Sequence, residues 1–149
     1  MGMKIWEVSD NFYYSSEPTV EGVKAAGIEA IICVSKKKTS PEVQATVEFE
    51  HWLYLHIMDG KTVEIEKFAY ASGWVMGNLY AGRTTLVHCY GGRNRSALTA
   101  ALVLRSLEDL TGEEALTELR KRSRPQAVMN PVFVEYLESL SKIEKGKSF

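Results

Sequence analysis

The sequence predicts one α/β domain over residues 1–149, with a central, largely parallel (mixed) sheet flanked by helices on both sides. A chain of 149 residues with 45% hydrophobic and 25% charged residues has the size and composition of a single globular domain. Its short apolar runs lack polar alternation, which is typical of strands buried on both faces. These runs alternate with helical segments, and this order favours parallel strands joined by helices.

The first half of the chain is expected to hold two helices and two strands. Thr19 is a good N-cap for a short helix that Gly27 ends. The β-branched run 28–34 then predicts a strand buried on both faces. Residues 40–42, Ser-Pro-Glu, combine a cap, a first-turn proline and an acid that suits the helix dipole, so they start a second helix. The run 52–57 predicts the next strand.

The second half is expected to contain one strand and four helices. Apolar side chains of 65–79 fall on one helical face, and a short strand follows at 85–88. Residues 97–107 are apolar almost all round, which predicts a central buried helix. Capping signals start the last two helices: Thr111 with Glu114, a capping box, and Asn130 with Pro131.

Composition excludes several classes of function. Lys+Arg number 18 against 19 Asp+Glu, so the chain lacks the basic excess typical of nucleic-acid binding. No secretory signal opens the sequence and no apolar stretch is long enough for a membrane span, so we expect a cytoplasmic protein. Cys33 and Cys89 are too few for a disulfide framework or a cysteine-based zinc site. No metal or other cofactor is expected.

The segment 88–96, His-Cys-Tyr-Gly-Gly-Arg-Asn-Arg-Ser, lies between a predicted strand and the buried helix. A helix N-terminus favours the thiolate of Cys89, which is the nucleophilic form of a cysteine. The glycine-rich loop can turn its backbone N–H groups inward as a cradle for a tetrahedral oxyanion, and Arg95 can grip two of its oxygens. The expected phosphate-binding residues are Tyr90, Gly91, Gly92, Arg93, Asn94 and Arg95.

A nucleophile of this kind needs a proton donor for the leaving group. Asp59 follows the strand 52–57 and would share a sheet edge with Cys89 if the two strands are parallel. Since aspartate before glycine is also common in plain turns, Glu64 and Glu66 remain alternative acids. Ser96 can donate a hydrogen bond to the sulfur and stabilise it as a leaving thiolate. The residues therefore predict phosphoryl transfer to cysteine and then to water.

His88-Cys89, five residues, then Arg95-Ser96 resembles the signature of the cysteine-dependent protein tyrosine phosphatases. The chain length and the position of Asp59, 30 residues before Cys89, resemble the compact dual-specificity branch. Similarity extends over most of the chain: residues 12–18, 27–32 and 130–133 resemble family segments.

The resemblance implies an enzyme that hydrolyses phosphotyrosine in proteins or peptides through a cysteinyl-phosphate intermediate. It implies inhibition by phosphate analogues such as vanadate. Phosphoserine and phosphothreonine stay open as further substrates. His88 would orient the loop. Asn130 matches a position that can help to place the hydrolytic water, although its place before Pro131 is also what an N-cap requires.

Two alternative functions stay open. Arg93 adds a second cation to the loop, as in lipid-phosphate phosphatases of the superfamily, so a phosphoinositide or other polyphosphate is the alternative substrate. The lysine run 36–38 could attract such an anion or could be an ordinary solvated loop. A phospho-binding module without turnover is the other alternative function.

Cys33 is expected to be a packed core thiol that does not pair with Cys89.

Overall fold

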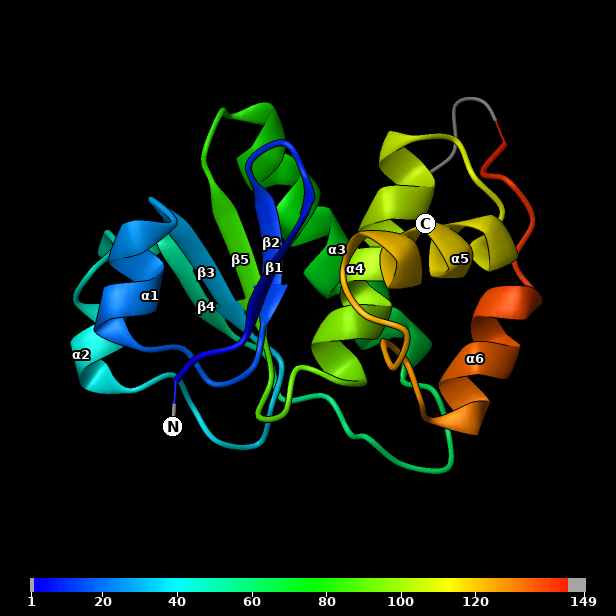
Figure 1. Ribbon diagram of the computed structural model, residues 1–149, viewed down its shortest axis with the longest axis horizontal. Coiled ribbons are helices and arrows are strands. Elements are labelled where there is room, and N and C mark those ends of the chain that lie inside the picture. Colours follow the sequence, from blue (N-terminus) through cyan, green and yellow to red (C-terminus); the bar gives the residue numbers. More distant parts are fainter. Residues whose placement is uncertain (1, 145–149) are drawn as a thin grey trace.

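The computed structural model describes residues 2–144 and has a five-stranded mixed sheet between two groups of helices, which confirms the expected fold class (Figure 1). The strand order is β1-β2-β5-β3-β4, with β5 in the centre. All neighbouring pairs are parallel except β1 and β2. The strands are β1 (Ile5–Ser9), β2 (Phe12–Ser15), β3 (Ala30–Cys33), β4 (Trp52–Tyr54) and β5 (Thr85–His88).

Two short helices cover one face of the sheet, and the longer helices lie on the other (Figure 1). The predicted caps Thr19, Ser40, Thr111 and Asn130 each accept a hydrogen bond from the first turn of their helix. The helices are α1 (Val20–Ala25), α2 (Pro41–Gln44), α3 (Ile65–Tyr80), α4 (Arg95–Leu107), α5 (Gly112–Arg122) and α6 (Pro131–Glu138), with a 3₁₀ turn at Phe49–His51.

Alternate side chains of the central strands pack on opposite faces of the sheet. Ile31 and Leu86 join the smaller apolar cluster beneath α1 and α2. Ile32 and Val87 join the larger cluster beneath α3 and α4. All four side chains are fully buried, as the absence of polar alternation in 28–34 predicts.

The hairpin of β1 and β2 forms one edge of the sheet and was not assigned from the sequence as a pair of strands. Asn11 makes its turn with φ of 62°, a left-handed conformation that asparagine tolerates better than most residues. The strands predicted at 28–34 and 52–57 are shorter in the structure, at Ala30–Cys33 and Trp52–Tyr54.

The parallel strands place three loops at one edge of the sheet. The segments that follow β3, β4 and β5 come together there, at the lower side of Figure 1. In open α/β sheets this carboxyl edge is where sites form. No helix among residues 2–144 is long and apolar enough to cross a membrane.

Candidate active site

The cysteine loop, residues 89–94, connects the buried strand β5 to the buried helix α4. Ser15 of β2 pairs with His88, and Ser15 O accepts a hydrogen bond from Cys89 N at 3.4 Å. Gly92 has φ of +65°, and a Cβ there would lie 2.7 Å from Ser16 N. Only glycine fits this backbone conformation and this close approach, so the loop folds tightly against the end of β2.

Two polar groups contact the sulfur of Cys89, which is 3% exposed. Gly92 N–H donates to Sγ at 3.2 Å, and Ser96 Oγ lies 3.1 Å from it. Ser96 Oγ also lies 3.3 Å from Ser15 O, and the residue is fully buried in the first turn of α4. A thiolate at this position would gain hydrogen bonds that stabilise its charge.

The carbonyl groups of the cysteine loop face away from its centre, because the 124–130 segment binds them from outside. Arg124 Nη2 donates to Gly92 O at 2.6 Å, and Val128 N donates to Arg93 O at 2.7 Å. In a trans peptide the N–H of the next residue points opposite to the C=O, so the N–H groups of Arg93 and Asn94 face inward. No residue in the described range accepts a hydrogen bond from the N–H groups of Gly91 or Arg93. The result is a cradle of backbone donors.

Arg124 was missed by the sequence analysis. Its guanidinium also stacks over Trp6 at 4.4 Å, and Trp6 stacks on Tyr14 at 4.9 Å. Tyr14 in turn donates to Ser123 Oγ at 2.7 Å. The contact between Arg124 and the loop depends on packing against β1 and β2, and one arginine in a basic segment carries no sequence signal for it.

Arg95 begins α4, and its guanidinium contacts the segment that follows β4. Nη1 donates to Ile57 O at 3.3 Å, while Nε is buried and lacks a hydrogen-bond partner among the described residues. A buried donor in this state is costly unless an acceptor reaches it, and a tetrahedral oxyanion offers acceptors that match the guanidinium fork. The donors and the charge fit a phosphate.

Asp59 lies in the Asp59 loop, residues 58–64, and is held against the cysteine loop by two amides. Asn94 Nδ2 donates to Oδ2 at 3.0 Å, and Asn130 Nδ2 donates to Oδ1 at 2.9 Å. Asn94 Oδ1 accepts from Met129 N at 2.7 Å and from Asn130 N at 2.8 Å. Three separate loops therefore meet at one exposed carboxylate, beside the residue that precedes Arg95.

The alternative acids have other surroundings. Glu64 accepts from Met58 N at 2.7 Å and forms an ion pair with Lys67 at 2.9 Å. The hydrogen bond from Lys67, with that from Met58, holds the pKa of Glu64 below its ordinary value, which makes it a poor proton donor. Glu66 lies exposed in the first turn of α3. Of the three carboxylates, Asp59 is the one that is hydrogen-bonded to Asn94 of the cysteine loop.

His88 lies beneath the loop and takes part in a buried hydrogen-bond chain. Trp52 Nε1 donates to Thr39 Oγ1 at 3.0 Å, and Thr39 Oγ1 lies 2.7 Å from His88 Nε2. His88 Nδ1 lies 3.2 Å from Cys89 O, a group that can only accept, so this nitrogen carries the proton. Burial lowers the pKa of His88 to about 4, so the imidazole is neutral at pH 7. It can orient the loop but does not supply a positive charge.

A cavity of about 480 Å³ opens at the mouth of the loop, lined by Ser35, Lys36, Lys37, Tyr90 and Arg95. The lysine run thus borders the candidate site. Lys37 is paired with Glu17 at 2.7 Å, and Lys38 lies over the ring of Tyr54 at 5.4 Å. Tyr90 is exposed at the rim, and Arg93 is exposed in the cysteine loop outside the cavity lining.

Asn130 has two roles in the structure. Its Oδ1 caps α6 by accepting from Val132 N at 3.0 Å, as its place before Pro131 predicts. Its amide binds Asp59 and, at 2.9 Å, Gly60 O.

Among residues 2–144, no group of three or more His, Cys, Asp or Glu side chains comes together as a metal site would require.

The fold and the cysteine loop are those of a dual-specificity phosphatase-like protein. The family model described as cyclin-dependent kinase inhibitor 3 (CDKN3) matches residues 16–116, and the chain belongs to this family. The match includes Asp59 and the whole cysteine loop. A search of curated proteins finds no sequence that matches the chain.

Solved structures with the same fold are numerous. Tk-PTP in its active form is 23% identical, with a TM-score of 0.76 over 91% of this chain and 96% of its own. A mouse putative dual specificity phosphatase, complexed with zinc tungstate, is 19% identical, with a TM-score of 0.75 over 90% and 86%. PTPMT1 in complex with PI(5)P is 20% identical, with a TM-score of 0.75 over 90% and 92%.

Proposed function

We propose that the protein hydrolyses phosphate monoesters through a cysteinyl-phosphate, with phosphotyrosine in a protein or peptide as its main substrate. The observation that carries the proposal is the inward-facing backbone cradle around Cys89, together with the buried Nε of Arg95, which lacks a partner within residues 2–144. These donors surround the sulfur as a transferring phosphoryl group requires. Membership in a dual-specificity phosphatase-like family supports the same reaction class.

In the first step the sulfur of Cys89 attacks phosphorus while the bond from phosphorus to the leaving oxygen breaks. Arg95 and the loop N–H groups stabilise the charge on the three equatorial oxygens. Asp59 transfers a proton to the leaving oxygen, which departs as the phenol of tyrosine. Phosphate is then bonded to sulfur, and Asp59 is left as a carboxylate.

In the second step water attacks phosphorus and the bond between phosphorus and sulfur breaks. Asp59 takes the proton that water loses, so the acid is restored. The departing thiolate of Cys89 gains hydrogen bonds from Ser96 and from Gly92 N–H, which lie 3.1 and 3.2 Å away. Inorganic phosphate leaves, and the enzyme returns to its starting state with no cofactor consumed.

The exposed aromatic ring of Tyr90 at the mouth supports an aromatic leaving group, because it can pack on the ring of phosphotyrosine. Phosphoserine and phosphothreonine are secondary substrates under this proposal. Vanadate is tetrahedral and negatively charged, so it should compete for the same donors.

A phosphoinositide or another polyphosphate is the second candidate substrate, and one observation favours it. Lys36 borders the mouth, and Arg93 is exposed within the loop itself, so two cations are available to further phosphates. PTPMT1, which shares the fold, is known in complex with PI(5)P. Arg93→Ala separates the two substrates: it should weaken hydrolysis of a phosphoinositide and leave a phosphotyrosine peptide nearly unaffected.

Turnover of para-nitrophenyl phosphate and of a phosphotyrosine peptide tests the proposal. Cys89→Ser and Arg95→Ala should each abolish both reactions, because each removes a group without a substitute. Asp59→Asn should slow mainly the peptide, since para-nitrophenolate leaves without a proton. Cys33→Ser is the matched cysteine control and should keep wild-type rates.

Two results would contradict the proposal. If the wild-type protein binds vanadate but hydrolyses neither substrate, it is a phospho-binding module. Turnover that persists in Cys89→Ser would exclude the cysteinyl-phosphate. Wild-type behaviour of Asp59→Asn on the peptide would move the acid to Glu64 or Glu66.

A further inference from the structure

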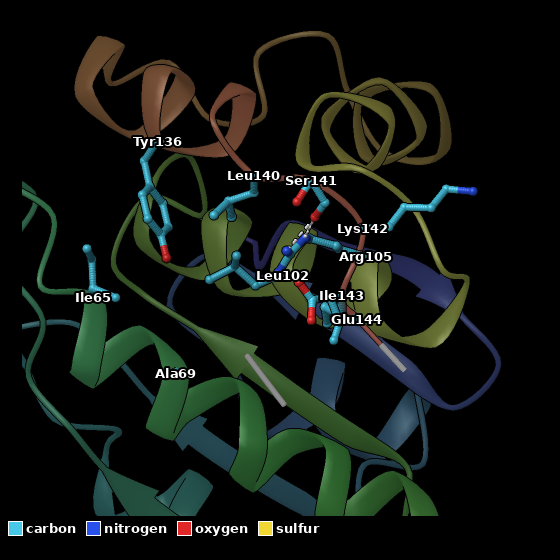
Figure 2. A pocket seen from close by; sticks show the side chains of 10 residues that line it. All are labelled: Ile65, Ala69, Leu102, Arg105, Tyr136, Leu140, Ser141, Lys142, Ile143 and Glu144. Atoms are coloured by element: carbon cyan, nitrogen blue, oxygen red, sulfur yellow. Dashed lines mark hydrogen bonds between the residues drawn. The ribbon is translucent and has the colours of Figure 1, made fainter. Parts of the chain in front are cut away.

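A second cavity, of about 250 Å³, lies apart from the cysteine loop (Figure 2). Three helices and the chain that follows α6 enclose it. None of its lining residues belongs to the cysteine loop or the Asp59 loop. Its lining residues are Ile65, Ala69, Leu102, Arg105, Tyr136, Leu140, Ser141, Lys142, Ile143 and Glu144.

Half of the residues that line this cavity are apolar. Ile65 and Ala69 come from α3, Leu102 from α4, and Leu140 from the chain that follows α6. In Figure 2 the side chains of Leu102, Leu140 and Tyr136 point into the space between these helices. Small-molecule sites have this character, with apolar walls and a few convergent polar groups.

Two polar groups converge on the apolar space. Arg105 is only 8% exposed, although it carries a charge, and its Nε donates to Ser141 O at 2.9 Å. Nη2 donates to the same oxygen, so these hydrogen bonds go to a carbonyl without net charge. The Tyr136 hydroxyl is the second group, and no residue within 2–144 hydrogen-bonds to it.

Burial disfavours the charge of Arg105, which an anion would relieve, and keeps the Tyr136 hydroxyl neutral. Burial lowers the pKa of Arg105, because the guanidinium has lost water without gaining an opposite charge of equal strength. Burial also raises the pKa of Tyr136, so its hydroxyl stays protonated and can donate. A carboxylate would accept from both, and Lys142 adds a further cation to the lining, against the one carboxylate of Glu144.

We propose that this cavity binds a small apolar carboxylate, with its chain against Ile65, Leu102 and Leu140 and its carboxylate between Arg105 and Tyr136. The volume lies slightly below the range of about 300–1,000 Å³ that drug-sized ligands occupy, so the ligand is a short chain. The proposal concerns binding alone. It stands whether or not Cys89 turns over a substrate.

Octanoate is the probe, and octan-1-ol is its uncharged counterpart. Titration of the full chain, followed by amide chemical shifts, gives both affinity and location. We expect a Kd on the order of 0.1–1 mM for octanoate, as suits a ligand of this size. The shifts should centre on Ala69, Leu102 and Ser141, and octan-1-ol should bind about tenfold more weakly.

Variants assign the binding to this cavity. Ala69→Phe fills it without removing a hydrogen bond and should abolish binding, while Tyr136→Phe should weaken octanoate about tenfold and leave octan-1-ol unchanged. Tyr70→Phe is the matched control for Tyr136→Phe. Tyr70 is exposed on α3, beside Ala69 but outside the cavity lining, so this variant should bind octanoate as the wild type does. Arg105→Gln would also remove hydrogen bonds that Arg105 donates to Ser141 O, so the test does not depend on this variant.

Three outcomes would overturn the proposal. Equal affinity for octanoate and octan-1-ol would remove the role of Arg105 and Tyr136. Undiminished binding in a folded Ala69→Phe variant would place the ligand elsewhere. Shifts centred on the cysteine loop, lost in Arg95→Ala, would show that octanoate merely occupies the phosphate cradle.

Discussion

Asn130 links the candidate acid to the rest of the site, and Asn130→Asp would break that link while keeping the helix cap. Its Oδ1 caps α6 through Val132 N, and its Nδ2 donates to Asp59 and to Gly60 O, both at 2.9 Å. Aspartate caps helices as well as asparagine does. The substitution therefore keeps the cap, removes two donors and sets an anion against Asp59.

The size of the effect follows from these contacts. Each lost hydrogen bond costs about 1 kcal/mol. Repulsion between two exposed carboxylates adds at most about 1 kcal/mol in water, and the exposure of Asp59 keeps that contribution small. The Asp59 loop is in equilibrium between a position bound to the cysteine loop and a released position. A total of about 2 kcal/mol shifts this equilibrium roughly 30-fold toward the released position.

The assay compares kcat for a phosphotyrosine peptide with kcat for para-nitrophenyl phosphate. Asn130→Asp should lower the first about 30-fold and the second less than about twofold, because only tyrosine needs a proton to leave. Asn130→Ser, which keeps a capping oxygen without the added charge, should fall between Asn130→Asp and wild type. Wild-type kcat on the peptide in Asn130→Asp would refute the positioning of Asp59 by Asn130. An equal loss on both substrates would indicate damage to the cysteine loop instead.

Three further predictions concern other parts of the chain. Burial lowers the pKa of His88 to about 4, against an ordinary value of 6.5, so only the unfolded state takes up the proton between these values. Unfolding free energy in urea should therefore drop by roughly 2–3 kcal/mol between pH 7 and 4.5, and His88→Gln should lack this component. Cys33 pairs in register with His88 and faces the side of the sheet away from Cys89, with Sγ 3.2 Å from Lys37 O. Mild peroxide should oxidise Cys89 without a link to Cys33, and a linked peptide at high yield in mass spectrometry would disprove this. Activity on para-nitrophenyl phosphate should persist in EDTA, since Arg95 and backbone donors supply the positive charge; loss of activity that a divalent ion restores would contradict the mechanism.

The fold could be predicted largely from local signals. The caps Thr19, Ser40, Thr111 and Asn130 depend on a few neighbouring residues, so the sequence alone locates these helix starts. The runs at 28–34 and 85–88 indicate burial on both faces, because apolar residues follow one another there without regular polar alternation. The pairing of β1 with β2 was harder to predict. These strands lie at one edge of the sheet, and amino-acid composition does not show that a segment is an edge strand.

The candidate site also contains residues that the sequence alone identifies and residues that only the structure identifies. Spacing along the chain is enough to single out Cys89, Arg95 and Ser96, because the strand, loop and helix are contiguous. Asp59 required the further assumption of parallel strands, which the register of β3 with β4 and β5 supports. Arg124 and the side-chain bonds of Asn94 could not be predicted, since they join segments about 35 residues apart through tertiary packing.

The 124–130 segment acts on both halves of the proposed reaction. Arg124 and Val128 bind the outward carbonyls of the cysteine loop, and Asn130 binds Asp59. Val128 does so with φ of 60°, which is strained for a β-branched residue and is held by burial and by its bond to Arg93 O. The orientation of the cradle and the position of the acid are therefore coupled through one short segment. This segment lies beyond residues 16–116, so the match to the family model does not extend to the side chains that hold Asp59 and the loop carbonyls from outside.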